Sequence, residues 1–405
     1  MIWSDTPPED CPFPRSEHWR GLGFTGRYRN YTSADTWYPA WASDGSLYSP
    51  WTDGSFGPDL TFPHDCSSQT GNDANRDHPG LAGTGHARIS GDDPMALTLE
   101  NLGIDYASSA PYGGRYPSAS LIHEDIWYYG TYCVDETGRT DEKGRPYNWD
   151  VLGPFVGFRI SRDHGHSWEP CPHSPVTPLF GESGKGGSKV RLGVPHFVDF
   201  GQNMRQSPDG HAYLVGHGTD NPQSRAAWIC GDGAWLARAR PDPHRPEWLN
   251  DPKAWTFFSG FSGPDDRGEA VWVAEVSASN PLIHRPGRIG HVTATWIPGL
   301  SRFLMCVTDG RDTISAFNSY ILEAPSITGP WSLVTWMEKF GEQGYFLNFP
   351  SKFISRSGTK AWLAFSANFT NHHLGLSHQD RPTGAKYALS LHETYLVSRD
   401  EKPRA

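Results

Sequence analysis

The sequence predicts an all-β fold, a β-propeller with five blades, and its composition favours that class. Aromatic residues make up 13% of the 405 residues, and 44 Gly and 34 Pro are spread along the whole chain rather than gathered in a linker. Many short strands joined by Gly- and Pro-containing turns, with aromatic side chains supplying the buried area, are typical of barrels, sandwiches and propellers. The length fits one large β domain as well as two average domains.

The number of blades follows from a pair of adjacent strands that recurs five times. These pairs span residues 36–54, 120–133, 196–218, 291–310 and 349–368. Turns at Asp44-Gly45, Asp209-Gly210 and Pro298-Gly299 are strong hairpin signals. A second strand pair follows each first pair, over residues 86–101, 155–170, 234–260, 318–336 and 387–399. Five four-stranded units predict five blades, because radial repetition protects the edges of the strands.

A larger ring stays open as an alternative. Six or seven blades would follow if the segments 54–85 or 261–290 contain further strands. The last strand, near residues 390–398, is expected to close the ring against the first blade. Almost no segment has the periodicity of a helix.

We expect residues 1–405 to form a single catalytic domain, with residues 1–30 as an irregular N-terminal arm. Two long polar loops, 55–85 and 171–192, interrupt the strand pattern. Loops of this length in compact domains are usually functional rims or disordered insertions. We expect both to form the rim of a pocket.

Charge and hydropathy limit the class of partner. The formal net charge is -10 and no run of Lys or Arg stands out, whereas binding to nucleic acid needs a basic stripe. No stretch approaches about 20 apolar residues, the length of a membrane-spanning helix. We therefore expect neither nucleic acid nor a membrane as a partner, and we expect a monomer.

The expected location is secreted or periplasmic rather than cytoplasmic. Residues 1–14 have no basic n-region and no apolar h-region, so the sequence as it stands carries no signal peptide. Two acceptor sequons, at Asn30 and Asn368, are the support for secretion.

Cysteine spacing gives no sign of a metal or redox centre. The six cysteines are widely separated and form no CxxC pair. Cys11 with Cys66 and Cys133 with Cys171 are the candidate disulfides, and buried free thiols are an equal alternative. No cofactor is expected, and since no ligand cluster has diagnostic spacing, a structural calcium ion stays open.

Short motifs that run in order from about residue 30 to residue 370 resemble a known group of enzymes. Ala34-Asp35-Thr36-Trp37-Tyr38-Pro39 leads to Leu47-Tyr48-Ser49-Pro50-Trp51-Thr52-Asp53-Gly54. The further motifs are PHFVDFG (195–201), AYLV (212–215), LARAR (236–240), WTFFSG (255–260), PGLSRFLM (298–305), GPW (329–331) and PSKF (350–353). In these motifs the chain resembles the five-bladed propeller enzymes of the bacterial endo-D-arabinanase group. The resemblance implies a five-bladed carbohydrate-active enzyme.

The same resemblance implies that acids near the first blade carry catalysis, and Asp35 and Asp53 are the positions that match. These residues bracket the first hairpin, and antiparallel partners separated by such a hairpin return to the same end of a blade. Two carboxylates at one rim can act as acid and base, or as acid and nucleophile, in glycoside hydrolysis. Asp220, at the end of the third hairpin, is a candidate third acid, whereas Asp44 is expected only to form a turn.

Histidine, arginine and aromatic side chains supply the other candidates. His86 follows a Gly-rich loop, and His196 and His291 start the third and fourth inner strands, whose first residues reach the pocket. His86 and His196 are candidate acid–base groups, because imidazole moves a proton at neutral pH. The candidate substrate-binding residues are Trp37, Arg88, Arg115, Tyr116, His291 and Lys352.

Three functions are compatible with these residues, and the leading one is a glycoside hydrolase that cleaves a plant or microbial polysaccharide or oligosaccharide. Five-bladed furanosidases generally place further acids at the start of the second and third inner strands, where this chain has Arg115-Tyr116-Pro117 and Pro195-His196. This supply of His, Arg and Tyr favours, as an alternative, a polysaccharide lyase acting at a uronic-acid linkage such as rhamnose–glucuronate. There Arg would neutralise the carboxylate and His or Tyr would remove the α-proton. The third function is a non-catalytic glycan-binding propeller, which predicts several equivalent rim pockets.

Overall fold

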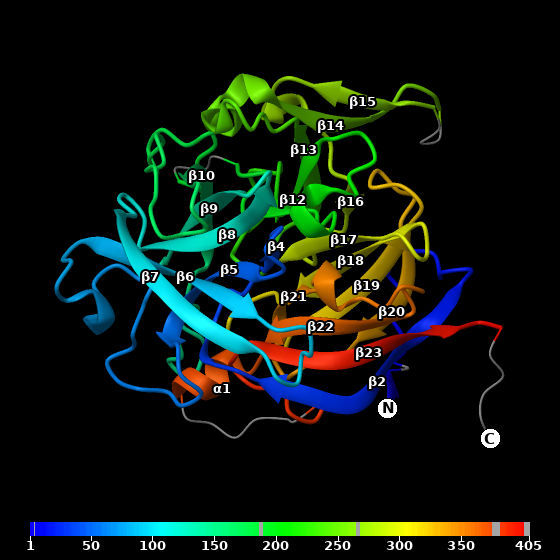
Figure 1. The fold of residues 1–405 in the computed structure, drawn as a ribbon, viewed down its shortest axis with the longest axis horizontal. Coiled ribbons are helices and arrows are strands. Elements are labelled where there is room, and N and C mark those ends of the chain that lie inside the picture. Colours follow the sequence, from blue (N-terminus) through cyan, green and yellow to red (C-terminus); the bar gives the residue numbers. More distant parts are fainter. Residues whose placement is uncertain (4, 186–188, 265–267, 375–380, 401–405) are drawn as a thin grey trace.

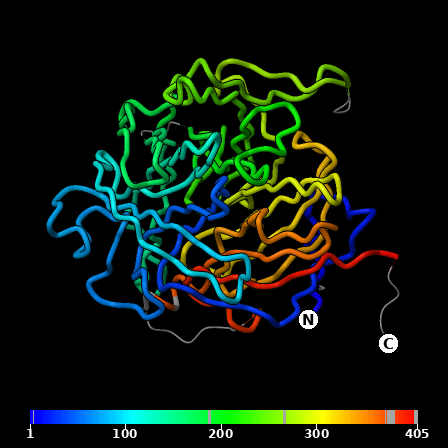
Figure 2. Tube along the Cα trace, in the orientation of Figure 1, coloured from blue at the N-terminus to red at the C-terminus, as the bar shows by residue number. Residues whose placement is uncertain are grey.

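Five antiparallel sheets surround a common centre and make a five-bladed β-propeller (Figure 1). The computed structural model describes residues 1–3, 5–185, 189–264, 268–374 and 381–400. The trace in Figure 2 follows the chain from sheet to sheet in sequence order around the ring. The predicted all-β class and the count of five blades are confirmed.

The first two blades are built from residues 33–161. Blade 1 contains β3 (Ser33–Asp35), β4 (Ala40–Trp41), β5 (Leu47–Ser55), β6 (Leu81–Ser90) and β7 (Thr98–Ser108). Blade 2 contains β8 (Gly114–His123), β9 (Ile126–Asp135) and β10 (Val151–Ser161), and an isolated bridge between Ile160 and Glu169 adds a short outer strand. Consecutive strands pair antiparallel, so each blade is a meander that starts at its inner strand.

Blades 3 and 4 follow the same plan. Blade 3 contains β11 (His196–Phe197), β12 (Ala212–Gly218), β13 (Gly233–Ala239), β14 (Trp255–Phe261), β15 (Ala270–Val273) and β16 (Ile283–His284). Blade 4 contains β17 (Val292–Ile297), β18 (Arg302–Asp309), β19 (Asn318–Ala324) and β20 (Ser332–Met337). The segment 261–290 does contain strands, but β15 pairs with β14 and β16 pairs with β13, so they extend blade 3 and form no sixth blade.

Blade 5 joins the two ends of the chain. It contains β21 (Tyr345–Asn348), β22 (Lys360–Ser366), β23 (Ser390–Ser398), β2 (Trp19–Asn30) and β1 (Ile2–Trp3). The N-terminal strand β2 lies beside the C-terminal strand β23 along its length, as the blue and red ribbons of Figure 1 show. The last strand therefore does not close the ring against the first blade. The N-terminal strand closes it by completing the last blade.

This closure corrects the expectation of an irregular arm over residues 1–30, because residues 19–30 form a twelve-residue strand. Its sequence, WRGLGFTGRYRN, hides the strand pattern because glycines stand where apolar side chains would normally alternate. Gly23 is required by close packing, since a Cβ at this position would lie 2.2 Å from the ring of Tyr395 on the neighbouring strand. Leu22 and Phe24 are buried on the inner side.

Helical structure in the described residues is limited to short connections. The elements are α1 (Phe369–Leu374), η1 (Asp73–Asn75), η2 (Gln202–Met204), η3 (Pro246–Asn250), η4 (Pro252–Ala254), η5 (Val276–Ala278) and η6 (Ser351–Phe353), where η marks a 3-10 turn. None of the described helices has the length and apolar character needed to span a membrane.

All six cysteines are free thiols, so neither candidate disulfide is formed. Cys66 is packed with Trp37 and Trp51 in the core of blade 1, whereas Cys11 contacts a different core cluster. Cys133 and Cys171 do contact one small cluster, but they are not bonded to each other. Burial raises the pKa of the Cys133 thiol to about 12, which keeps it protonated and unreactive.

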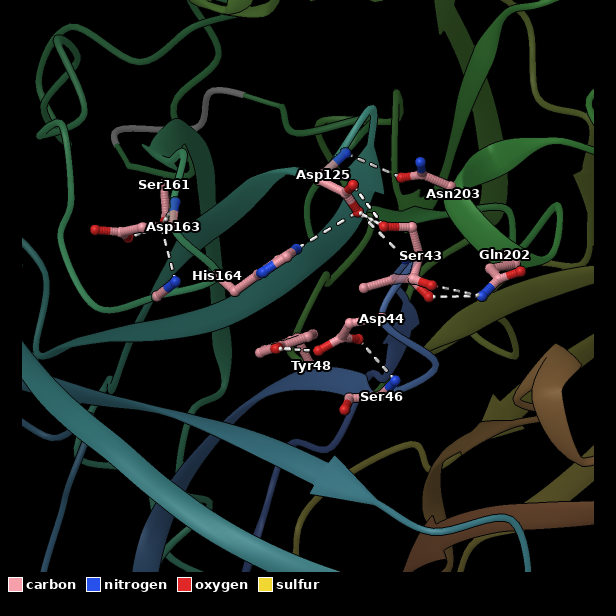
Figure 3. A network of polar contacts seen from close by, with 12 residues as sticks. Ser43, Asp44, Ser46, Tyr48, Asp125, Ser161, Asp163, His164, Gln202 and Asn203 are labelled. Atoms are coloured by element: carbon pink, nitrogen blue, oxygen red, sulfur yellow. Dashed lines mark hydrogen bonds and ion pairs between the residues drawn. The ribbon is translucent and has the colours of Figure 1, made fainter.

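A polar network ties the turns of blades 1, 2 and 3 together at the face where the inner strands end (Figure 3). The Ser43 hydroxyl donates to Asp125 at 2.6 Å, and the Asp125 backbone N–H donates to the side-chain oxygen of Asn203 at 3.1 Å. Asp44 accepts hydrogen bonds from the Ser46 backbone N–H and the Tyr48 hydroxyl, both at 2.8 Å. Asp44 is therefore the turn residue that the sequence predicts.

Candidate functional site

A small cavity lies at the centre of the propeller, at the face where the inner strands begin. Two carboxyl groups line it, those of Asp35 and Asp53 of blade 1. The rest of its wall consists of Tyr116, Tyr132, Val134, Trp149, Trp228, Phe346 and Phe369. The free volume is about 20 Å³, room for about one water molecule. Different blades thus converge on a pair of acids in aromatic surroundings.

Asp35 is the last residue of β3 and is almost completely buried. One of its carboxyl oxygens accepts a hydrogen bond from the Tyr345 hydroxyl at 2.7 Å, and the other accepts one from the Thr36 hydroxyl at 2.8 Å. Burial raises the pKa of Asp35 well above its usual range, and the negative charge of Asp53 raises it further. Both effects favour the protonated form of this carboxyl group.

Asp53 is placed by an unusual backbone conformation in β5. Its φ is 47°, and the next residue, Gly54, has a φ of 154°. A Cβ at Gly54 would lie 2.0 Å from the carbonyl oxygen of Ser33, so only glycine fits where β5 passes β3. The pairing of these two strands is irregular at this point. The Asp53-Gly54 pair is thus part of the geometry of the cavity, in addition to being a turn-forming sequence.

The loop 55–85 holds Asp53 from the other side. The Ser67 hydroxyl and the Ser68 backbone N–H donate to one carboxyl oxygen of Asp53, at 2.9 and 2.8 Å. Burial raises the pKa of Asp53 to about 6, and these two hydrogen bonds limit the rise. Asp53 is therefore the member of the pair that ionises first. The described parts of the other long loop, 171–185 and 189–192, do not line the cavity, and residues 186–188 lie outside the described residues.

Replacing Asp53 with Asn is expected to stabilise the protein at neutral pH. The pKa of this carboxyl is about 6 in the folded protein and about 4 in an unfolded chain. Ionisation thus disfavours the folded state, and the free energy of unfolding falls as the pH rises from about 4 to about 6. The Asn variant lacks this loss, which is about 3 kcal/mol.

Thermal unfolding of the two proteins at pH 4 and pH 7 measures this difference. The melting temperature of the variant, relative to the parent, should increase between the two pH values. A difference that is the same at both would show that ionisation of Asp53 costs the folded state nothing.

Two tyrosines at the site were not predicted from the sequence. Tyr345 donates to Asp35, and Tyr387 donates to the backbone carbonyl oxygen of Asp53 at 2.6 Å. Burial raises the pKa of both hydroxyls far above neutral, so they act as hydrogen-bond donors. Tyr345 is the first residue of the fifth inner strand, which begins before the predicted span 349–368. A blade alignment that placed this strand correctly would have found Tyr345, whereas Tyr387 is the first residue of the predicted span 387–399 and lies just before β23, where no motif singles it out.

An acid that interacts electrostatically with the cavity wall was also missed. Glu136 follows β9, is exposed, and its negative charge contributes to the raised pKa of Tyr116 in the cavity wall. Partial burial and the nearby Asp150 and Asp135 raise the pKa of Glu136 itself. Its position after a strand of blade 2 is the one signal in the sequence that could have singled it out.

His196 and His291 lie in the wall of the central channel but do not line the cavity. His196 stacks on Tyr38 with ring centroids 3.7 Å apart, and His291 stacks on Phe346 at 4.3 Å. Burial and neighbouring histidines hold the pKa of both well below the usual range. Their ring nitrogens have no hydrogen-bond partner among the described residues. These imidazoles are neutral packing groups, which gives the predicted acid–base role of His196 no geometric support.

Of the two predicted aromatic contacts, the structure brings only Tyr116 into the cavity. Trp37 is packed against Trp51 and Phe56, with its indole N–H donating to the carbonyl oxygen of Ala34. The reason is the backbone of Thr36, whose φ of 65° interrupts the alternation of the strand. Trp37 is therefore core rather than a sugar platform.

The predicted acid His86 and the predicted third acid Asp220 also lie outside the cavity lining. His86 is buried between blades 1 and 2, where the Trp168 indole N–H donates to it at 3.3 Å. It belongs to the third strand of its blade, which is too far from the axis to reach the channel. Asp220 follows β12 in a turn and is partly exposed.

Three predicted cationic contacts are used elsewhere in the propeller. Arg88 donates to the Ser46 hydroxyl at 3.0 Å and pairs with Asp44 at the opposite face. Lys352 donates to the carbonyl oxygens of Gly45 and Gly91 at 2.6 and 2.7 Å. Arg115 is buried on the side of β8 that faces a groove between blades. No Arg, Lys or His is therefore among the described residues that line the cavity.

Among the described residues, no group of three or more His, Cys, Asp or Glu is arranged to hold a metal ion. No protein-family model matches the chain, and no curated protein matches its sequence.

Solved structures that are similar to this chain include a putative hydrolase, an α-L-arabinofuranosidase and an endo-arabinase. A putative hydrolase from Bacteroides ovatus has a TM-score of 0.46 and 10% identity, over 96% of this chain and 92% of that one. An α-L-arabinofuranosidase from Podospora anserina in complex with cellotriose has a TM-score of 0.42 and 10% identity, over 90% and 92%. An endo-arabinase from Bacteroides thetaiotaomicron has a TM-score of 0.41 and 8% identity, over 95% and 97%. Each of these proteins is similar to this chain over nearly its whole length, at low sequence identity.

Proposed function

We propose that the protein is a glycoside hydrolase whose acid pair is Asp35 and Asp53. The observation that carries this proposal is the pair itself: two carboxyl groups, both with a raised pKa, share one buried cavity and interact electrostatically. Carboxyl groups whose environments separate their pKa values divide the roles of acid and base at one pH. Glycoside hydrolysis requires that division.

The roles follow from the order of ionisation. Asp35 keeps its proton at neutral pH and is placed to give it to the oxygen of the leaving sugar. Asp53, whose pKa is about 6, is ionised at neutral pH and is held as a carboxylate by Ser67 and Ser68. Its carboxylate is the base that activates water or the nucleophile that attacks the sugar. The aromatic rings of the wall offer apolar faces to the C–H groups of a sugar ring.

The closed form of the cavity has a consequence for substrate binding. A free volume of about 20 Å³ is far below that of a sugar ring, so part of the wall must move when a substrate binds. Trp149 is only partly buried and has a φ of 56°, an uncommon conformation outside glycine. We propose that the segment bearing Trp149 is the part of the wall that opens.

A lyase mechanism has less support from this site. A lyase needs a cation to neutralise the uronate carboxylate before the α-proton is removed. The described lining of the cavity contains no cation, and Arg88 and Arg115 both point elsewhere.

A non-catalytic binding propeller also has less support, because the acid pair is confined to blade 1. The other inner strands begin with residues such as Gly114, His196 and Tyr345. A binding propeller with equivalent pockets would repeat its polar groups around the ring.

One assay tests the reaction type directly. The protein is incubated with a panel of plant and microbial polysaccharides, and reducing ends and absorbance near 235 nm are followed together. Reducing ends without absorbance are expected, since hydrolysis creates no double bond. Absorbance with uronate-containing glycans would overturn the proposal in favour of a lyase, and no product from any glycan would favour a binding protein.

The hydrogen bond from Tyr345 predicts a shift in the pH profile. Tyr345→Phe removes a donor that favours the ionised form of Asp35, so the pKa of this acid should rise and the alkaline limb of activity should move to higher pH. The measurement is kcat/KM against pH for the variant and the parent. Tyr129→Phe is the matched control, because Tyr129 is equally buried and donates to the carbonyl oxygen of Gly85, away from the acids. If the alkaline limb of the variant stayed at the same pH as that of the parent and only the activity were lower, the role of Tyr345 would be structural.

A further inference from the structure

A groove on the side of the propeller, between blades 1 and 2, is independent of the acid pair. Strands β6 and β7 of blade 1 and strands β8, β9 and β10 of blade 2 supply its walls. Its free volume is about 190 Å³, room for about six water molecules. Side chains alternate along a strand, so on β8 Tyr116 faces the central cavity while Arg115 faces this groove. The groove is thus open space with its own polar groups.

Arg159 is the first of two arginines that line the groove. Its guanidinium is buried between the rings of Tyr129 and Trp168, at 3.8 and 4.4 Å from their centroids. It forms an ion pair with Asp105, whose side chain is partly exposed. Burial lowers the pKa of Arg159 to about 9, which still leaves it cationic at neutral pH. Its Nε has no hydrogen-bond partner among the described residues.

Arg115 is the second, and it has no carboxylate partner. Its Nε donates to the Thr131 hydroxyl at 2.9 Å and its Nη1 donates to the carbonyl oxygen of Ser108 at 3.2 Å. These bonds fix the guanidinium, but among the described residues no carboxylate lies within ion-pair distance of Arg115. With Asp105 taken by Arg159, the groove carries one uncompensated positive charge in a chain of net charge -10. A buried cation without a counter-ion is costly unless a ligand supplies one.

We propose that this groove binds a sugar residue that carries one carboxylate, with the guanidinium of Arg115 taking the carboxylate. Planar guanidinium groups bind carboxylates through two parallel hydrogen bonds. One uncompensated charge matches a monoanion better than the dianion of a phosphate ester. Trp168 and Tyr106, both partly exposed, add aromatic surface beside the ring faces that Arg159 and His78 cover, and the second carboxyl oxygen of Asp105 can accept from sugar hydroxyls. The site is a binding site for an acidic glycan unit, separate from the acid pair.

Calorimetric titration with three probes tests this directly: D-glucuronate, D-glucose and D-glucose 6-phosphate, at low salt. Glucuronate is expected to bind, glucose to bind at least about tenfold more weakly, and added NaCl to weaken glucuronate binding. The same titration on Asp35→Asn should be unchanged, which separates this site from the catalytic proposal. Equal binding of glucose, tighter binding of glucose 6-phosphate, or no binding of glucuronate would overturn the proposal.

Variants locate the site. Arg115→Gln is expected to weaken the binding of glucuronate at least about tenfold. Arg115→Lys keeps the positive charge but cannot form the two parallel hydrogen bonds of a guanidinium, so it should lose less affinity. Arg162→Gln is the matched control, because Arg162 is an exposed arginine of the same blade whose partner is Glu169. Far-UV circular dichroism establishes that each variant is folded. Glucuronate binding that is equally strong in Arg115→Gln and in Arg162→Gln would overturn the assignment to this groove.

Discussion

Asp35→Asn and Asp53→Asn are each expected to lower kcat/KM by about 10²–10⁴-fold on the best glycan of the panel. An amide at position 35 has no proton to give to the leaving oxygen, and an amide at position 53 is neither base nor nucleophile. The two changes are nearly isosteric, and each amide keeps one acceptor oxygen. At position 53 this oxygen can accept from both Ser67 and Ser68, and at position 35 it can accept from Tyr345. The loss should therefore come from chemistry and not from packing. Release of reducing ends under kcat/KM conditions measures it.

The control has to be an acid that is buried but remote from the cavity. Asp199 fits, because its pKa is raised by burial while it accepts hydrogen bonds from Ser351 and Gly201 beyond the far end of the inner strands. Asp199→Asn should keep activity within a few-fold of the parent, even if it changes the melting temperature. If Asp35→Asn and Asp53→Asn both kept activity like this control, the acid pair would have no catalytic role. A loss in only one would reassign the remaining role to another group, and Glu136, whose charge acts on Tyr116 of the cavity wall, would be the first to test.

The acid pair could be found from the sequence because it depends on local geometry. A hairpin returns its two ends to one place, and Asp35 indeed lies opposite Thr52, the residue before Asp53. The blades could be counted for the same reason, since hairpin signals are short-range. What the sequence alone does not reveal is the direction of individual side chains near irregular backbone. A positive φ at Thr36 sends Trp37 into the core, and no propensity predicts that conformation for a β-branched residue.

Contacts between blades are the other feature that could not be predicted from the sequence. Tyr345 reaches Asp35 across 310 positions of sequence, and the cations expected at the pocket are used in turns and grooves instead. On β8 a shift of one residue decides whether a side chain faces the cavity or the groove, so Arg115 and Tyr116 could not both be pocket residues. Long-range pairing also explains the N-terminal strand, whose partner is the last strand of the chain.

Deleting residues 1–30 is expected to abolish folding. The deletion removes β1 and β2, and with them the buried side chains of Trp3, Leu22 and Phe24. Burial of one large apolar side chain contributes about 1.5–3 kcal/mol, so the three amount to most of the 5–15 kcal/mol that stabilises an ordinary domain. The deletion also leaves β23 as an unpaired edge, which invites aggregation. Solubility, far-UV circular dichroism and thermal unfolding of the truncated protein measure the effect.

Moving β2 to the other end of the chain, rather than removing it, tests whether loss of ring closure is the reason that the truncated chain does not fold. β2 and β23 are antiparallel, with Trp19 opposite Ser398 and the Arg399 backbone N–H donating to the carbonyl oxygen of His18. A short linker can therefore join residue 400 to residue 15 as a hairpin. A permuted chain that begins at Tyr31 and carries residues 15–30 after residue 400 should recover the fold that the truncation loses, since the pairing of β2 with β23 is restored. The permuted chain still lacks residues 1–14, so its failure to fold would mean that these residues contribute more than closure. A truncated chain that folds and unfolds cooperatively like the parent would show that the ring does not need its N-terminal strand.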